Sequence, residues 1–135
     1  MATILTIGNE LVSGDVTNTN ASWLAQRLAP LGVAVRLIAA VPDEIEAIAG
    51  IVRLEAPRSD FVVVTGGLGG TPDDLTREAL AAAFEVGQEV QPEVAERLRA
   101  RFHRDPDYVT RWAELPAGSR ALENPLGGAR SAAAL

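Results

Sequence analysis

The chain of 135 residues contains no cysteine and no lysine, and each absence excludes a class of chemistry. Without cysteine there are no disulfides, no thiol nucleophile and no thiolate metal site. Without lysine there is no Schiff base, and the P-loop motif of many nucleotide-binding proteins cannot form. No apolar run approaches the roughly 20 residues that span a bilayer, and no basic segment precedes an apolar stretch near the N-terminus. We therefore expect a cytoplasmic protein without a membrane segment or a signal peptide.

Basic residues are also outnumbered by acidic ones. The formal net charge is −6, from 12 basic and 18 acidic residues. A nucleic-acid groove needs a basic surface that releases counterions from phosphate, so this balance argues against a nucleic-acid partner. The composition, 47% hydrophobic and 22% charged, is ordinary for a soluble globular protein, and the length suits one domain. The expected partner is a small molecule.

Short apolar segments alternate with helical patterns three times along the first two thirds of the chain. The apolar segments 4–7, 33–41 and 61–65 are expected to be strands. After each of them, apolar residues recur at helical spacing, within 21–28, 45–52 and 75–82. Strand–helix alternation with almost continuously apolar strands is typical of a parallel sheet covered on both faces. The sequence therefore predicts an α/β domain.

The remainder of the chain is less regular. A fourth helix is expected to begin at Pro92, with Val94, Leu98 and Phe102 on its buried face. From Asp105 onward, frequent Pro, Gly and Asn predict loops, with one short strand near residues 121–122. The aromatic residues Trp23, Tyr108 and Trp112 are expected to be core or packing residues rather than a platform on which a base stacks.

The segment after the third expected strand, residues 65–76, reads TGGLGGTPDDLT. Four glycines, at 66, 67, 69 and 70, let the backbone approach a ligand and turn its amides toward it. The helix that follows adds the positive end of its dipole, which favours phosphate. The dinucleotide motif Gly-x-Gly-x-x-Gly does not fit, because Pro72 takes the place of its third glycine. The sequence predicts a phosphate-binding loop of another kind.

The two adjacent carboxylates of this segment, Asp73 and Asp74, have two readings. Thr71 could cap the third helix, Pro72 could be its first residue, and Asp74 could complete a capping box. In that case the two acids only stabilise the helix N-terminus. In the other reading they hold a metal ion or act on the phosphate. The sequence leaves both readings open.

Two further polar segments follow the first and second expected strands. Residues 8–20 carry Glu10 shortly after a strand end, and residues 41–44 carry Asp43. Ligands of open parallel sheets bind beyond the carboxyl ends of the strands, where these segments and the glycine-rich segment should meet. Carboxylates from different strands could there hold a hydrated Mg²⁺. Alternatively, Asp43 only caps a helix and the polar residues of 8–20 only fold their own loop.

Together these segments resemble the molybdopterin-binding (MoaB/Mog-like) domain, in the form found at the front of competence/damage-inducible protein A. The resemblance rests on IGNELVSG at 7–14, NTN at 18–20, VPD at 41–43 and the motif at 65–76, with DYVTRW at 107–112 and LENPLG at 122–127. It covers residues 3 to about 128. It implies a three-layer α/β/α domain with a mostly parallel sheet that often forms homo-oligomers.

The resemblance also implies roles for individual residues. Asp43 and Asp74 match acids that support adenylyl transfer in the molybdenum-cofactor relatives, which bind molybdopterin. In the competence/damage-inducible branch the domain is associated with metal-dependent cleavage of ADP-ribose. The expected phosphate-binding residues are Thr65, Gly66, Gly67, Gly69, Gly70 and Thr71; the expected substrate-binding residues are Gly8, Asn9, Glu10, Ser13 and Asn20; and the expected ligands of Mg²⁺ or a similar cation are Glu10, Asp73 and Asp74.

Two departures from the family pattern affect these expectations. Many relatives have Asp at the position of Asn18, so one acid is missing here. In relatives, the stretch that matches residues 127–129 continues into Pro-Gly and a further strand, whereas Arg130 follows here. We therefore expect a family domain at residues 1–128 that is incomplete at its C-terminus, and a tail at 129–135 that is foreign to the family.

Three functions remain open on the sequence alone. The leading one is a nucleotide- or pterin-phosphate-binding domain that acts, if complete, as a metal-dependent ADP-ribose pyrophosphatase. The alternative for the same site is a role in molybdenum-cofactor biosynthesis, by adenylylation or binding of molybdopterin. The second is a non-catalytic binding or oligomerisation module whose acids only cap helices. The third is an inactive fragment.

Overall fold

A three-stranded parallel sheet forms the centre of the computed structural model, which describes residues 1–101, 106–122 and 132–133. The strands β1 (Ala2–Ile7), β2 (Val35–Val41) and β3 (Phe61–Thr65) lie in the order β2-β1-β3. The central strand β1 is buried along its whole length. This explains why β1 is mostly apolar, with only Thr3 and Thr6 as polar residues, and the three strands predicted from the sequence are confirmed.

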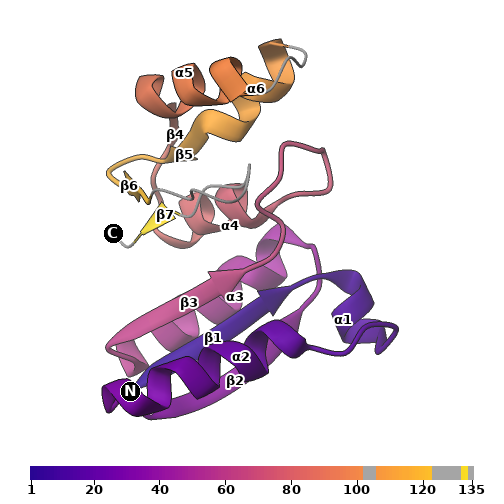
Figure 1. Cartoon of the computed structure of the whole chain (residues 1–135), viewed down its shortest axis with the longest axis vertical. Coiled ribbons are helices and arrows are strands. Elements are labelled where there is room, and N and C mark those ends of the chain that lie inside the picture. The colour runs from indigo at the N-terminus through magenta and orange to yellow at the C-terminus, as the bar shows by residue number, and fades with distance from the viewer. Residues whose placement is uncertain (102–105, 123–131, 134–135) are drawn as a thin grey trace.

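Helices cover both faces of this sheet, so the domain has three layers (Figure 1). The helices α1 (Asn9–Ser13) and α2 (Thr19–Leu28) connect β1 to β2 and are followed by the 3₁₀ turn η1 (Ala29–Leu31). The helix α3 (Ile45–Glu55) and the 3₁₀ turn η2 (Ala56–Arg58) connect β2 to β3, and α4 (Thr76–Ala83) follows β3. Helices α3 and α4 pack against each other, whereas α2 contacts β1 and β2. The α/β/α architecture is confirmed.

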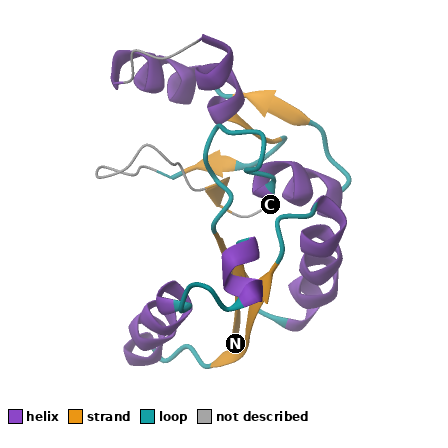
Figure 2. Cartoon of the chain, turned by 90° about the vertical axis from the view of Figure 1, so that its right-hand side faces the viewer, coloured by secondary structure: helices purple, strands orange, loops and turns teal. Residues whose placement is uncertain are grey.

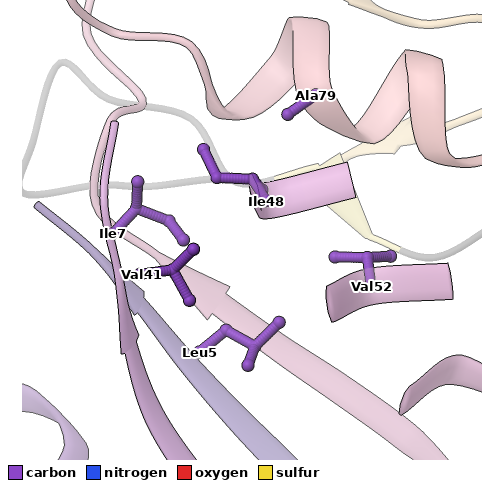
Figure 3. Close-up of a cluster of buried hydrophobic side chains, with 6 residues drawn as sticks. All are labelled: Leu5, Ile7, Val41, Ile48, Val52 and Ala79. Carbon is purple, nitrogen blue, oxygen red and sulfur yellow. The ribbon is translucent and has the colours of Figure 1, made fainter. Parts of the chain in front are cut away.

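The main hydrophobic core lies between the sheet and the α3–α4 layer. It is formed by the buried side chains of Leu5, Ile7, Val41, Ile48, Val52 and Ala79 (Figure 3). Successive side chains of a strand point to opposite faces. Leu5 and Ile7 therefore enter this core, while Thr6 faces α2 and receives a hydrogen bond from the Asn18 side chain at 2.7 Å. This core fixes the strand ends at which the three polar segments begin.

A second part of the chain, residues 88–122, packs on α4 through β5 (Figures 1 and 2). It contains β4 (Gln88–Val90), α5 (Pro92–Arg101), α6 (Pro106–Ala113), β5 (Glu114–Pro116) and β6 (Arg120–Ala121). Strand β4 pairs antiparallel with β5, and β6 pairs antiparallel with β7 (Ala132–Ala133). Its own core joins α5 and α6 through Val94, Ala95, Leu98, Val109, Trp112 and Ala113.

The helix α6 corrects the expectation of loops after residue 105. Pro106 stands at its first position, where the missing amide hydrogen has no helical partner to lose. Val109, Trp112 and Ala113 are spaced three and four residues apart, and all are buried against α5. The short strand expected near residues 121–122 is present as β6. His103, Phe102 and the stretch 123–131, with the predicted domain end at 128, lie outside the described residues.

A buried carboxylate lies at the amino end of the sheet, opposite to the polar segments. Glu55, the last residue of α3, is 3% exposed and forms ion pairs with Arg36 and, at 3.6 Å, with Arg58. The Thr3 hydroxyl donates a hydrogen bond to it at 3.2 Å. This group links β1, β2 and α3.

Candidate functional site

Two loops at the carboxyl end of the sheet are joined by a reciprocal pair of hydrogen bonds. The Asn9 amide donates to Oδ2 of Asp43 at 3.0 Å, and the Asp43 amide donates to Oδ1 of Asn9 at 3.1 Å. Asn9 follows β1 and Asp43 follows β2, so the pair ties the ends of two neighbouring strands. The capping position of α3 is Glu44, without a side-chain cap. Asp43 is therefore not the helix cap that the alternative reading assumed.

The glycine loop, which we define as residues 66–75 between β3 and α4, comes close to the end of β1 and to Asp43. A Cβ on Gly66 would lie 2.1 Å from the carbonyl oxygen of Ile7. A Cβ on Gly67 would lie 3.4 Å from Oδ1 of Asp43. Both glycines have positive φ, 97° and 59°, which side-chain-bearing residues rarely adopt. The three polar segments predicted to converge therefore meet at Asp43, which Asn9 contacts from the first segment and Gly67 from the third.

Thr76 fixes the two ends of the loop to each other. Its hydroxyl donates to the Gly66 carbonyl at 2.7 Å, and its amide donates to the Gly67 carbonyl at 3.2 Å. The side chain is fully buried, so these bonds are shielded from water. Thr76 is the first residue of α4, which begins four residues later than the expected start at Pro72.

Asp74 closes a turn inside the glycine loop instead of capping α4. Its Oδ2 accepts hydrogen bonds from the Thr71 amide at 3.0 Å and from the Thr71 hydroxyl, and its own amide donates to the Thr71 carbonyl at 3.1 Å. The capping-box reading identified the right pair of residues but assigned them to a helix N-terminus. Asp73 is exposed at the outer side of this turn.

The pKa of Asp74 lies below its ordinary value. Burial alone would raise the pKa, but the hydrogen bond from the Thr71 hydroxyl, those from the backbone of Thr71 and Gly69, and the charge of Arg77 together outweigh it. At neutral pH this carboxylate is therefore ionised, as both metal binding and electrostatic roles require.

Arg77 is a site residue that the sequence analysis missed. It is 1% exposed, and its guanidinium donates to the carbonyl of Leu68 at 2.9 Å and to the carbonyl of Gly69. Burial lowers its pKa, although the neighbouring Glu78 and Asp74 favour the charged form. One signal was available in the sequence: a basic residue in the first turn of a helix opposes the helix dipole and requires another explanation.

The second part of the chain also reaches the glycine loop. The indole nitrogen of Trp112 donates to the Leu68 carbonyl at 2.9 Å, and the Tyr108 ring lies against Gly70. The two rings meet edge to face, with centroids 5.5 Å apart. The expectation that Trp112 and Tyr108 are packing residues is confirmed, and the surface against which they pack is the loop itself.

The residues expected to bind substrate after β1 lie in different surroundings. The Glu10 carboxylate lies over Gly8, and the Ser13 hydroxyl donates to Asp15 at 2.6 Å. Asn20 instead lines a hollow of about 280 Å³. The structure therefore brings Asn9 into the group of Asp43 and the glycine loop, but it does not show Ser13 turned toward that group.

The hollow lies between α2 and the outer strand β3. It is lined by Asn20, Trp23 and Leu24 of α2, by residues 63–65 and by Leu68. Trp23 is 56% exposed and carries the Arg27 guanidinium 5.2 Å from its ring centre. Trp23 is therefore not a core residue, and its ring packs along the surface of α2.

The described residues contain neither a cluster of metal ligands nor a membrane-spanning helix. In the ranges 1–101, 106–122 and 132–133, no three or more His, Asp or Glu side chains form a group that could hold a metal ion. Glu10, Asp73 and Asp74 accordingly do not form such a group. Within the same ranges, no helix has the length and apolar character needed to cross a membrane.

Comparison with known proteins identifies relatives of the whole chain. A family model described as "Probable molybdopterin binding domain" matches residues 3–134. A CinA-like protein of Frankia casuarinae is 42% identical over 137 residues, covering 95% of this chain and 32% of the relative. The chain spans 31–55% of the length of the first curated relatives that it matches.

Two solved structures extend the comparison to the fold. The crystal structure of CinA from Thermoplasma acidophilum, a protein described as of unknown function, has a TM-score of 0.91 at 30% identity, and the match covers 97% of this chain and 79% of that one. The molybdopterin biosynthesis enzyme MoaB from Thermus thermophilus has a TM-score of 0.52 at 30% identity, with coverages of 82% and 70%.

Proposed function

The chain belongs to the probable molybdopterin binding domain family, and from this premise we propose that the carboxyl end of its sheet binds the phosphate groups of a nucleotide or a pterin. One observation carries the proposal: the ends of three strands meet. The Asn9–Asp43 hydrogen bonds join the ends of β1 and β2, and Gly67, which follows β3, lies beside Asp43. Ligands of parallel sheets bind at such an edge, and a glycine-rich loop allows a phosphate to approach the backbone.

As the ligand we favour a nucleoside diphosphate ester such as ADP-ribose over a pterin phosphate. The similarity to the CinA structure is closer than that to MoaB, with TM-scores of 0.91 and 0.52 at the same identity. The sequence resemblance attaches ADP-ribose cleavage to the CinA branch and molybdopterin to the MoaB/Mog branch. The family description and the MoaB likeness keep the pterin as the second candidate.

The donor set suits a divalent cation that takes most of its ligands from substrate and water. Oδ2 of Asp43 is engaged by Asn9, while Oδ1 accepts no hydrogen bond from the described residues and faces Gly67. Mg²⁺ commonly binds through one or two carboxylates plus substrate phosphate. Asp43 would hold it, with Asp74 or Glu10 as the second acid. Such an ion would offset the charge of the diphosphate at a site whose own acids repel it.

The protein's own residues have separate roles in this proposal. Glycine-loop amides hydrogen-bond the phosphate oxygens, which fixes the diphosphate in place. Asn9 holds Asp43 in one orientation through its backbone and side-chain bonds. Asp74, ionised at neutral pH, keeps the turn of the loop closed through Thr71.

Incubation with ADP-ribose and Mg²⁺ or Co²⁺ tests catalysis, with AMP as the product to be measured. We expect AMP to form, and the Asp74→Ala variant to lose turnover while it still unfolds cooperatively. Undiminished activity in Asp74→Ala would leave Asp74 a turn-closing residue without a part in the chemistry.

Calorimetric titration separates binding from catalysis. ADP-ribose that binds without turnover indicates a non-catalytic binding module. Stronger binding of a pterin phosphate than of ADP-ribose would favour the molybdenum-cofactor alternative. Failure to bind either ligand in a protein that unfolds cooperatively would contradict the proposal, and non-cooperative unfolding would indicate an inactive fragment.

A further inference from the structure

We propose that Arg77 and Trp112 are positioning residues that set the direction of the peptide groups in the glycine loop, so that the amides not bound by Asp74 face the phosphate. This inference rests on the proposed phosphate-binding function and deepens it. Neither side chain is expected to touch the ligand. They act on the opposite side of the loop, by binding its carbonyl oxygens.

Four successive carbonyl groups of the loop are held from the side of α4 and α6. The Gly66 and Gly67 carbonyls accept from the hydroxyl and the amide of Thr76. The Leu68 carbonyl accepts from both Arg77 and Trp112, each at 2.9 Å. The Gly69 carbonyl accepts from the second guanidinium nitrogen of Arg77. The peptide groups therefore cannot turn over without breaking a hydrogen bond that is at least partly buried.

The direction of the amides follows from the planarity of the peptide bond. In a trans peptide the N–H of one residue points away from the C=O of the residue before it. When the carbonyls of Leu68 and Gly69 point to Arg77, the amides of Gly69 and Gly70 point to the other side. The backbone of Gly69 and the amide of Thr71 serve an anion already, the Asp74 carboxylate. Among the described residues, no backbone acceptor is present for the amides of Leu68 and Gly70.

The shapes of the Arg77 and Trp112 side chains suit them to bind the carbonyl oxygens of the loop. Arginine presents several N–H groups in a rigid planar fork, which can bind two neighbouring carbonyls at once, whereas a lysine has a single ammonium centre. Arg77 is the largest of the fully buried side chains among the described residues, so its position is set by packing on all sides. Trp112 adds a donor from a distant part of the chain and thereby couples α6 to the loop.

Arg111 and Tyr108 of α6 make further contacts with the glycine loop and with α4. The Arg111 guanidinium donates to the Pro72 carbonyl at 3.4 Å and forms an ion pair with Glu78 at 3.3 Å. The Tyr108 ring covers Gly70, where a Cβ would approach the ring to 3.0 Å. The loop is therefore bound from its carbonyl side by one surface, formed by the first turn of α4 and by α6.

The test compares Arg77→Lys and Trp112→Phe with wild type, using inorganic pyrophosphate as the probe in calorimetry and ¹⁵N NMR to follow the loop amides. Trp112→Phe removes the N–H donor and keeps an aromatic ring. Arg53→Met is the matched control, because Arg53 also donates to a backbone carbonyl, that of Ala82 at 3.0 Å, but at the far end of α4 and away from the loop.

We expect both variants to shift the amide resonances of Gly69 and Gly70 and to bind pyrophosphate about tenfold more weakly, since a charged acceptor loses aligned donors. Arg53→Met should match wild type in both measurements. Wild-type affinity in Arg77→Lys and Trp112→Phe, with shifted loop resonances, would overturn the positioning role. If wild type itself binds no pyrophosphate, the proposed function fails. In that case the NMR measurement still tests the positioning role, and unchanged loop resonances in both variants would overturn it. If Arg77→Lys does not fold, Trp112→Phe alone decides.

Discussion

The two ends of the central sheet each carry a carboxylate that links neighbouring elements, but they use it differently. At the amino end, Glu55 is buried and surrounded by Arg36, Arg58 and Thr3. At the carboxyl end, Asp43 is partly exposed, binds the backbone of Asn9 and keeps Oδ1 without a partner among the described residues. A carboxylate whose oxygens are engaged stabilises the fold. One with an open oxygen beside glycine backbone can still bind a ligand.

The same contrast extends to the backbone around each carboxylate. Glu55 stands at the end of a regular helix, where strand and helix residues surround it. Asp43 faces Gly67, one of two successive glycines with positive φ that bring the loop against the end of β1. The carboxyl end therefore combines irregular backbone with access, whereas the amino end is regular and closed.

The largest effect on stability is expected from Glu55→Gln at the amino end. The variant leaves the Arg36 charge partly buried without its partner, which should lower the free energy of unfolding by about 3 kcal/mol. Urea denaturation measures this loss. The folded variant should bind ADP-ribose with wild-type affinity. A clear loss of affinity would contradict the assignment of stability to the amino end and ligand binding to the carboxyl end.

Asp43→Ala should show the reverse pattern at the carboxyl end. We expect at least about a tenfold loss of ADP-ribose affinity and only about 1 kcal/mol of stability, because one hydrogen bond to the Asn9 amide is removed. The neighbour Glu44 provides the control, since Glu44→Ala should change neither quantity. Equal effects in the two variants would mean that Asp43 contributes only general negative charge.

Thr76→Val tests whether the glycine loop depends on its own closure. The change keeps the shape of the side chain but leaves the Gly66 carbonyl without its hydroxyl donor, which should cost about 1–2 kcal/mol. Thr110→Val in α6 is the control, with an expected change below about 0.5 kcal/mol. A neutral Thr76→Val would show that the glycines hold the loop closed without this bond.

The smallest effect is expected from the ionisation of Asp74. Because its pKa is lowered in the folded state, Asp74 stabilises the fold above the ordinary pKa of the carboxyl, and this contribution disappears as the pH falls through the lowered value. Between about pH 5 and pH 2, Asp74→Asn should therefore lose less stability than wild type, by a few tenths of a kcal/mol for a partly exposed group. Parallel pH curves of unfolding would contradict this assignment.

The sequence was sufficient for the sheet and for the convergence of the three polar segments at its carboxyl end. Apolar runs and helical spacing are local, and they located β1, β2, β3 and the order of the covering helices. The convergence of the three polar segments followed from the parallel arrangement, since the carboxyl ends of parallel strands meet at one edge. Asp43 and the glycines of residues 66–70 were identified in this way.

Contacts across long sequence separations were beyond reach of the sequence. Trp112 binds the Leu68 carbonyl 44 residues away, and nothing local to either residue encodes that pairing. The local role of the Thr71–Asp74 pair was left open for the opposite reason, because a turn and a capping box place these two residues at the same spacing. The start of α4 at Thr76 decides between them. The predicted domain end at residue 128, the oligomeric state and the metal stay predictions.

The central claim is that the carboxyl end of the sheet, and not its amino end, binds a phosphate-bearing ligand. Calorimetric titration of ADP-ribose into wild type, Asp43→Ala and Glu55→Gln tests it most directly. We expect binding by wild type, retained affinity in Glu55→Gln and at least about a tenfold loss of affinity in Asp43→Ala. Equal affinity in Asp43→Ala and wild type would contradict it.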